Sequence, residues 1–271
     1  MESIKELKMI CQQIRHETDD WYMWHVLRKI SILVTWFLLH TPINANGVTL
    51  LFILTGFGIC GLFLSGTKLA FFLGALGLHF WYVLDLVDGE IARYRKESKA
   101  TGRFFDYMAH YIVHPWFFIA IGFGLYRTYG NLAIFLCSIV AGYSVHLVEA
   151  MVDVYCSVLY KRVKAKLLDP AKDIVFKKMP AFQHEQKNKS IARRVFSALH
   201  YVSTFPAILY IMLPLSILNL LLPVEVFVPW ILFYACVPTL VWLGRVTVFV
   251  REKKIDSEYT QLDNALQARG R

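Results

Sequence analysis

The hydrophobic positions of this chain fall into long runs separated by short polar segments. Six runs approach the ~20 residues that a helix needs to cross the core of a bilayer. They cover about residues 48–65, 69–93, 104–125, 132–154, 196–221 and 227–250. The pattern predicts an all-α polytopic membrane protein, with a six-helix transmembrane domain at 41–250 and a cytoplasmic tail at 251–271.

Residues 1–40 differ from the runs that follow. Residues 1–20 are polar and predicted to be helical, whereas 21–40 are apolar but carry Arg28 and Lys29 near the middle, with three tryptophans. Basic side chains and tryptophan in one apolar helix are typical of a helix lying in the membrane interface. We therefore predict a cytoplasmic, interfacial amphipathic segment at 1–40, with a crossing helix as the less favoured alternative.

Composition supports a membrane location. Hydrophobic residues make up 56% of the chain, against about 45–50% in soluble domains. The net charge of +9 sits in blocks between apolar stretches. An anionic membrane face or a phosphorylated substrate is therefore favoured, and no nucleic-acid partner is expected. The five cysteines are scattered without a CxxC spacing, so neither a disulfide framework nor a zinc site is predicted.

The basic residues predict the orientation in the membrane. They gather in the loop between spans two and three, in the stretch 161–194 and at the start of the tail, whereas the alternate loops are nearly free of charge. Loops rich in Lys and Arg stay on the cytoplasmic side. Both termini are therefore predicted to be cytoplasmic, together with the ends of spans two and three.

One stretch places carboxylates and imidazoles on both sides of that second loop. Asp85 and Asp88 are three residues apart, and Asp106, His110 and His114 recur every four. At helical pitch each set shares one face of a helix. Carboxylates gathered in a small volume repel one another unless cations neutralise them. Oxygen ligands of this kind suit Mg²⁺, Mn²⁺ or Ca²⁺.

The neighbours of these carboxylates indicate a phosphorylated ligand. Arg93 and the basic residues after it favour a diphosphate or a phosphate ester. Gly89 and Ala92 leave the helix surface bare beside Asp88, where a flat group could approach the backbone. Metal, phosphate and a pocket at membrane level together indicate phosphoryl transfer to or from a lipid.

At these residues the chain resembles the CDP-alcohol phosphotransferase family, whose signature is D-x2-D-G-x2-A-R-x8-G-x3-D-x3-D. Seven of its eight marked positions match here at the family spacing: Asp85, Asp88, Gly89, Ala92, Arg93, Gly102 and Asp106. The eighth is His110 where the family has aspartate. The resemblance covers residues 40–160 well and the rest of the chain in topology only.

The resemblance implies a metal-dependent reaction. In the family, the aspartates hold one or two divalent metals, Mg²⁺ or Mn²⁺, against the diphosphate of a CDP-alcohol. Carried over, this makes Asp85, Asp88 and Asp106 metal ligands, and Gly102 would permit a close turn into the third span. An acceptor hydroxyl attacks the phosphorus on the alcohol side and CMP leaves. The resemblance also implies a homodimer.

The resemblance further implies a nucleotide site. Gly89, Ala92 and Arg93 would lie along the cytidine nucleotide. Upstream, the segment from Asn46 to Thr49 is similar to the N-x-x-T signature that opens the family's first span, although Ala45 replaces the usual proline. Asn46 and Thr49 are therefore expected to assist in binding the nucleotide.

His110 stands where the family has its proposed base, which is also a metal ligand. A neutral imidazole can accept a proton at cytoplasmic pH. It can also bind a metal through one nitrogen, which would shift the preference from Mg²⁺ toward Mn²⁺ or a later transition metal. We predict that His110 and Asp106 are the catalytic residues and that His110 also binds metal. The alternative is a hydrogen-bonded core histidine in an inactive relative.

Other polar residues of the spans are weaker candidates. His114 is predicted to pack beside the site rather than to bind the metal. His146, Glu149 and Asp153 share one face of the fourth span, where ionisable residues are functional suspects. The stretch 161–194 is predicted to be a solvated loop near anionic headgroups, with binding of a phosphorylated acceptor as the alternative.

These observations predict an integral membrane transferase that moves a phospho-alcohol group from a CDP-alcohol to a hydroxyl acceptor. CDP-diacylglycerol is favoured as the donor, because a chain this short resembles the smaller phosphatidyltransferases. The acceptor stays open. One alternative is a catalytically silent relative that binds CDP-lipid or regulates a partner. The other is a transporter, which is disfavoured because spans one, five and six hold almost no charge.

Overall fold

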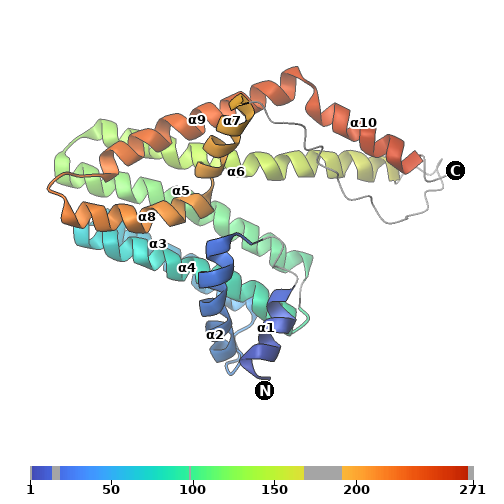
Figure 1. Cartoon of the computed structure of the whole chain (residues 1–271), viewed down its shortest axis with the longest axis horizontal. Coiled ribbons are helices and arrows are strands. Elements are labelled where there is room, and N and C mark those ends of the chain that lie inside the picture. The colour runs from blue at the N-terminus through green and yellow to red at the C-terminus, as the bar shows by residue number, and fades with distance from the viewer. Residues whose placement is uncertain (1, 14–18, 98, 168–190, 268–271) are drawn as a thin grey trace.

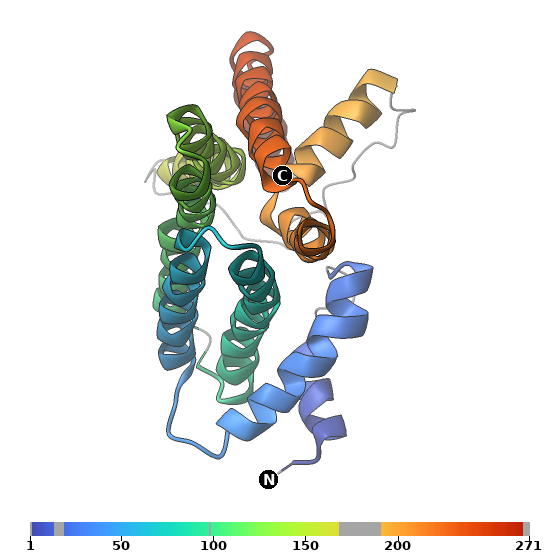
Figure 2. The same ribbon diagram turned by 90° about the vertical axis from the view of Figure 1, so that its left-hand side faces the viewer.

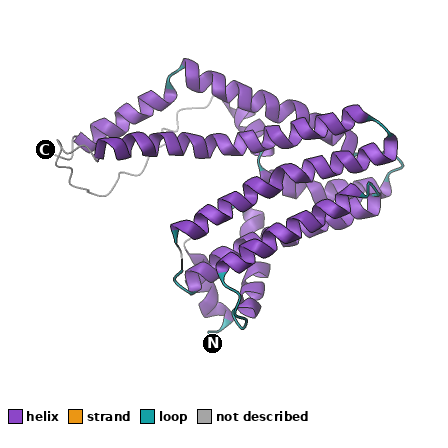
Figure 3. Cartoon of the chain, turned by 180° about the vertical axis from the view of Figure 1, so that it is seen from behind, coloured by secondary structure: helices purple, strands orange, loops and turns teal. Residues whose placement is uncertain are grey.

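The computed structural model describes residues 2–13, 19–97, 99–167 and 191–267, which form helices and contain no strand. In chain order the elements are α1 (Ile4–Gln12), the π-helix η2 (Met23–Leu27), α2 (Arg28–Leu38), α3 (Ala45–Leu64), α4 (Lys68–Tyr94), α5 (Ala100–Tyr129), α6 (Leu132–Leu167), α7 (Ile191–Val202), α8 (Phe205–Leu221), α9 (Phe227–Arg251) and α10 (Lys254–Gln267). The predicted all-α class is confirmed (Figure 3).

The ends of the long helices follow from local sequence. Asn44 caps α3 by accepting a hydrogen bond from the Gly47 N–H, and Thr67 caps α4 in the same way through Ala70. Side-chain caps of this kind satisfy the free N–H groups of the first helical turn. Between these two helices, Gly66 has a φ of +72° and lies against the Gly124 carbonyl, where a Cβ would come within 2.2 Å. Only glycine fits that turn.

Helix α3 is central to the half of the molecule that carries the signature. It packs against both α4 and α5, while α5 packs on α6 and α6 on α9 (Figure 1). Glycines allow close approach: a Cβ on Gly56 of α3 would lie 2.5 Å from Val113 Cγ1 of α5 and 2.9 Å from Trp81 Nε1 of α4. Small residues at such contacts are how helices pack closely inside membranes.

Five described helices, α3, α4, α5, α6 and α9, are long and apolar enough to cross a membrane. The predicted fifth span, 196–221, differs from the prediction because it is bent by 67° between α7 and α8. Thr204 has an extended backbone, and Pro206 follows at the first turn of α8. Proline provides no N–H, so Pro206 is tolerated in the first turn of α8, whereas a helix continuing through it from α7 would lose a hydrogen bond. If the bent pair is one span, the described chain has up to six spans.

The N-terminal segment consists of several short helices and not of a single interfacial helix. A π-helical turn, η2, leads into α2, and both α1 and α2 pack on α4. Figure 2 shows α2 running obliquely against α4, with α1 beside it. The predicted basic stretch 161–194 lies largely outside the described residues. Helix α6 continues to Leu167, and residues 168–190 are not among those described.

Candidate active site

Three ligand-bearing side chains from two helices meet in one place. His110 Nε2 lies 2.8 Å from Asp85 Oδ1 and 3.3 Å from Asp106 Oδ1. One ligand atom from each of the three residues lies within 4.8 Å of the others, which is close enough for all of them to bind one cation. The structure therefore brings together the carboxylates that the sequence places on opposite sides of the second loop.

Asp88 occupies the inner edge of this group. It is only 8% exposed, and its Oδ2 accepts a hydrogen bond of 2.7 Å from the hydroxyl of Thr49 on α3. Asp85 and Asp106 lie close enough to repel its charge. Thr49, predicted to assist the nucleotide, thus contacts a predicted metal ligand. Asp88 does not belong to the three-residue ligand group.

A chain of hydrogen bonds leads away from His110. Its Nδ1 lies 3.0 Å from His114 Nε2, and His114 Nδ1 lies 2.9 Å from Glu149 Oε2 on α6. The other oxygen of Glu149 accepts the N–H of Phe205 at 2.9 Å, at the start of α8. The Phe205 ring stacks on the His114 imidazole, with centroids 4.1 Å apart. The site is thereby connected to the bend between α7 and α8.

This chain fixes which nitrogen of each imidazole carries a proton. An ionised carboxylate only accepts hydrogen bonds, so His114 donates from Nδ1 to Glu149 and, when neutral, accepts at Nε2. His110 must then donate from Nδ1, which leaves its Nε2 lone pair facing Asp85 and Asp106. Three electron-pair donors directed at one another require a proton or a metal between them. The donor set therefore fits a divalent cation, and orientation by an outer carboxylate is usual for metal-binding histidines.

Aromatic rings form the apolar side of the site. Phe52 stacks on Trp81 with centroids 4.0 Å apart, and its ring meets the His110 imidazole edge-on at 4.9 Å. Trp81 is fully buried and donates from Nε1 to the Phe52 carbonyl at 2.9 Å. These contacts hold α3 and α4 together beneath His110, so the imidazole has little freedom to turn.

The predicted nucleotide residues lie further along α4. A Cβ on Gly89 would be 3.1 Å from Arg93 Nη1, so the Arg93 guanidinium lies over the bare backbone there. Arg93 also donates from Nε to the carbonyl of Cys11 at 2.6 Å. Ala92, which lies between Gly89 and Arg93 in sequence, is partly exposed on the same helix.

The expected role of Gly102 is corrected by the structure. Helix α5 begins at Ala100, so Gly102 lies in its first turn and not in the turn that precedes it. The reversal falls earlier, where Lys96 adopts a φ of +55° directly after α4. A Cβ on Gly102 would lie 3.6 Å from Asn46 Oδ1, an ordinary contact. Gly102 and Asn46 are therefore neighbours, although neither lies in the tight turn.

The three polar residues predicted on one face of α6 have different partners. Glu149 joins the histidine chain, whereas Asp153 accepts a hydrogen bond from the Tyr111 hydroxyl. The His146 ring meets Tyr111 edge-on, and its Nδ1 has no hydrogen-bond partner among the described residues. Sequence reasoning grouped the three residues correctly on one helix face, but it could not tell that Glu149 alone of the three bonds to His114.

The sequence did not predict one buried group of charged residues, which lies between the N-terminal segment and α4. Arg28 is 4% exposed, and its guanidinium pairs with Asp19 at 2.7 Å and with Glu90 at 3.1 Å. The interfacial interpretation of 21–40 rested in part on Arg28, whereas the structure buries this side chain against α4. The available signal was Glu90, a charged residue in the middle of an apolar motif helix.

Helices able to cross a membrane and a cluster of two carboxylates and an imidazole at the signature define an integral membrane protein with a candidate metal centre. The family model described as CDP-alcohol phosphatidyltransferase matches residues 42–242. The chain belongs to this family.

Solved structures show the same fold. The chain is similar to the crystal structure of phosphatidylinositol phosphate synthase (PgsA1) from Mycobacterium tuberculosis with CDP-DAG bound. The TM-score is 0.53 at 16% sequence identity, over 81% of this chain and 92% of that one. A search of curated protein sequences found no match.

Proposed function

We propose that this protein transfers a phosphatidyl group from CDP-diacylglycerol to a hydroxyl acceptor and releases CMP. The observation that carries the proposal is the meeting of Asp85, Asp106 and His110 within one ligand sphere, at the signature of the family. The relative of the same fold was crystallised with CDP-DAG bound, which supports a lipid donor. Positive-inside patterning supports an active site that faces the cytoplasm, with both termini on that side.

The bond changes follow from the family chemistry. The acceptor oxygen forms a bond to the phosphorus that carries the diacylglycerol group, and the bond from this phosphorus to the oxygen of CMP breaks. The acceptor loses its hydroxyl proton, and CMP departs with the electron pair. A divalent metal, Mg²⁺ or Mn²⁺, would neutralise charge on the diphosphate and polarise it for attack. In the proposal, Asp85, Asp106 and His110 would hold this metal, and Asp88, which lies outside that three-residue group, would complete the ligand set.

The roles of the side chains follow from their contacts. His110 contributes Nε2 as a ligand, because its other nitrogen is committed to His114. One nitrogen cannot bind metal and accept the substrate proton at the same time. The proton is therefore assigned to Asp106, whose side chain, at 34% exposed, is more open than those of Asp85 or His110. A positioned carboxylate can serve as such a general base. Gly89, Ala92 and Arg93 receive the nucleotide, with Asn46 and Thr49 beside them.

Binding measurements test the first half of the proposal. Purified protein in detergent should bind CDP-diacylglycerol, and CDP more weakly, only when Mg²⁺ or Mn²⁺ is present. Asp85→Asn should weaken binding of the metal and of the nucleotide together. Asp153→Asn on α6 is the matched control, because Asp153 contacts Tyr111 and not the ligand group. Metal-independent binding would contradict the proposal, and binding without CMP release would identify a silent CDP-lipid-binding relative.

A further inference from the structure

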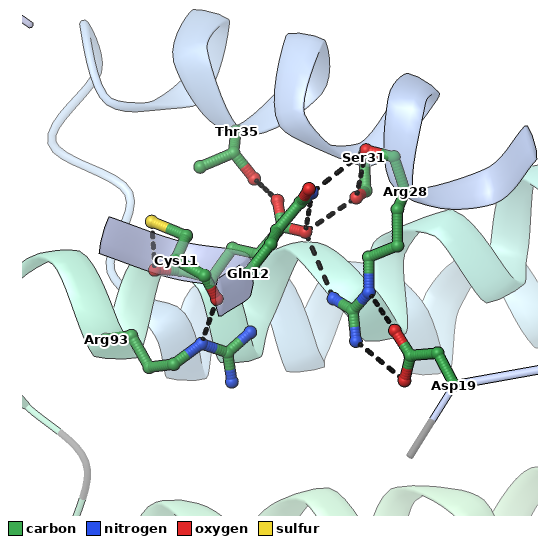
Figure 4. A network of polar contacts seen from close by, with 8 residues as sticks. Cys11, Gln12, Asp19, Arg28, Ser31, Thr35 and Arg93 are labelled. Carbon is green, nitrogen blue, oxygen red and sulfur yellow. Dashed lines mark hydrogen bonds and ion pairs between the residues drawn. The ribbon is translucent and has the colours of Figure 1, made fainter. Parts of the chain in front are cut away.

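A completely buried carboxylate lies inside the signature, on a position that the signature leaves unspecified. Glu90 is 0% exposed, and four side chains from the N-terminal segment donate to it. Figure 4 shows these donors, which come from α1 and α2 and converge on α4. We call this group the Glu90 clasp; its members are Gln12, Arg28, Ser31, Thr35 and Glu90.

The clasp satisfies both carboxylate oxygens. Oε1 accepts hydrogen bonds from Gln12 Nε2 at 2.8 Å, Arg28 Nη1 at 3.1 Å and Ser31 Oγ at 2.7 Å. Oε2 accepts one from Thr35 Oγ1 at 2.7 Å. Arg28 is held in turn by Asp19 (Figure 4). An ionised carboxylate deep inside a protein needs such a complete set of donors.

A second link joins the end of α1 to the same helix. The Cys11 thiol donates to the Glu90 carbonyl at 3.4 Å, and the Cys11 carbonyl accepts the Nε–H of Arg93 at 2.6 Å. Arg93 is the signature residue assigned to the nucleotide. The N-terminal segment therefore contacts both the buried carboxylate and the arginine that would meet the donor.

Stability alone does not account for such a group. Replacing a buried ion pair by apolar side chains of similar volume is often neutral or stabilising, so a buried pair is weak evidence for stability. Its better attested use is to fix one arrangement of packed helices. Glu90 follows Asp88 by two residues, so the two project about 200° apart around α4. Thr49 holds Asp88 from one side and the clasp holds Glu90 from the other.

We propose that Glu90 is a positioning residue, through which the N-terminal helices set the rotation of α4 and the placement of Arg93 for the donor nucleotide. The inference rests on the proposed function for the role of Arg93. It makes α1 and α2 a working part of the donor site and not only a membrane-surface anchor.

Kinetics of matched variants test the positioning role. In Glu90→Ala the KM for CDP-diacylglycerol should rise about tenfold or more, a loss of 1.4 kcal/mol per factor of ten, while the KM for the acceptor stays within a factor of about two. Glu90→Gln keeps an acceptor for the Oε1 donors, and the Thr35 hydroxyl can rotate to accept from its amide. This variant should recover most of the donor affinity.

The control for general destabilisation is Asn219→Ala. Asn219 is also 0% exposed and accepts the Val226 N–H at 3.0 Å, at the far end of α8. It should lower the thermal stability of the protein and leave the donor KM unchanged. An equal rise in donor and acceptor KM in Glu90→Ala, or no rise in either, would overturn the inference.

Thiol labelling of Cys11 gives a second readout of the clasp, in the Glu90 variants and in the wild-type protein. Burial raises the pKa of Cys11 to about 11, and its side chain is 1% exposed. The closed clasp should therefore protect it from maleimide at neutral pH. Glu90→Ala should speed Cys11 labelling about tenfold or more, as read by peptide mass spectrometry, and Asn219→Ala should not.

In the wild-type protein, CDP with Mg²⁺ should slow Cys11 labelling, because coupling between two sites is reciprocal. If CDP binds and Cys11 labelling does not change, the inference fails while the proposed function stands. If the wild-type protein binds no CDP-diacylglycerol and no CDP, both fail together. In that event, fast Cys11 labelling in Glu90→Ala would show that the clasp holds the helices together and has no role in donor binding.

Discussion

His110 Nδ1 and His114 Nε2 lie 3.0 Å apart, one helical turn along α5. Since Glu149 holds the other nitrogen of His114, this contact commits His110 to present Nε2 to Asp85 and Asp106. The replacement of the family's last aspartate by histidine is thus accompanied by a carboxylate on α6 that orients the imidazole. A histidine left over in an inactive relative would not need this support.

If His110 is a metal ligand, its replacement should weaken metal binding. His110→Ala should lower metal affinity and turnover together, and excess Mn²⁺ should restore part of the turnover. His110→Asp, which restores the family residue, should remain active with a shift of metal preference toward Mg²⁺. Isothermal titration of the metal and metal-dependent CMP release give the two readouts. Lost turnover with unchanged metal affinity would instead make His110 the base.

Glu149→Gln should act on the site through His114. The amide offers one acceptor where Glu149 offers two, to His114 Nδ1 and to the Phe205 N–H. If the amide nitrogen faces His114, the proton order of both imidazoles reverses and His110 Nε2 loses its lone pair toward the carboxylates. We expect metal affinity to fall about 10–100-fold, as for other partners of metal-binding histidines.

The control for Glu149 lies one turn further along the same helix. Asp153→Asn alters only the contact with the Tyr111 hydroxyl and should leave metal affinity within a factor of about two. Equal effects of the two substitutions, measured by metal titration, would mean that the histidine chain does not orient His110.

Thr49 should matter through its hydroxyl. Thr49→Val keeps the shape but leaves Asp88 Oδ2 without its donor at 2.7 Å. Loss of one partner from a buried carboxylate costs about 1–3 kcal/mol, so weaker binding of metal and nucleotide is expected. Thr49→Ser retains the hydroxyl and should bind almost as wild type. Equal binding by all three proteins would place Asp88 outside the metal site.

Two glycines of α3 offer a matched test of the packing beneath the site. Gly56→Ala would place a Cβ 2.5 Å from Val113 Cγ1, whereas a Cβ on Gly58 meets nothing within 4 Å. Overpacking of this kind costs about 1–3 kcal/mol. Thermal unfolding in detergent should show a lower Tm for Gly56→Ala and no loss for Gly58→Ala. A loss shared by both would point to backbone effects and not to the contact with α5.

The apolar runs predicted most of the helices because a bilayer imposes both their length and their hydrophobicity. The break between α7 and α8 was not predicted, although Pro206 stands there, because proline also occurs inside the continuous helices α5 and α9, at Pro115 and Pro238. At the break, the N–H of Phe205 donates to Glu149 on α6, and this contact between two helices cannot be read from the local sequence.

The signature predicted the meeting of Asp85, Asp106 and His110, because its fixed spacing places them on facing turns of two helices. The Glu90 clasp could not be predicted in the same way. Its members lie up to 78 residues apart in sequence, and Arg28 in an apolar stretch is equally typical of an interfacial helix. Only the packing of α2 on α4 distinguishes a buried ion pair from a side chain that reaches toward water.

The central claim is that the cluster at the signature catalyses transfer from a CDP-lipid. The most direct measurement is CMP release by the purified protein from CDP-diacylglycerol, with Mg²⁺ or Mn²⁺ and a panel of hydroxyl acceptors. We predict acceptor-dependent CMP release that chelation of the metal abolishes and that is lost in Asp106→Ala. CMP release that persists in Asp106→Ala, or none with any acceptor while CDP-diacylglycerol remains bound, would contradict the account.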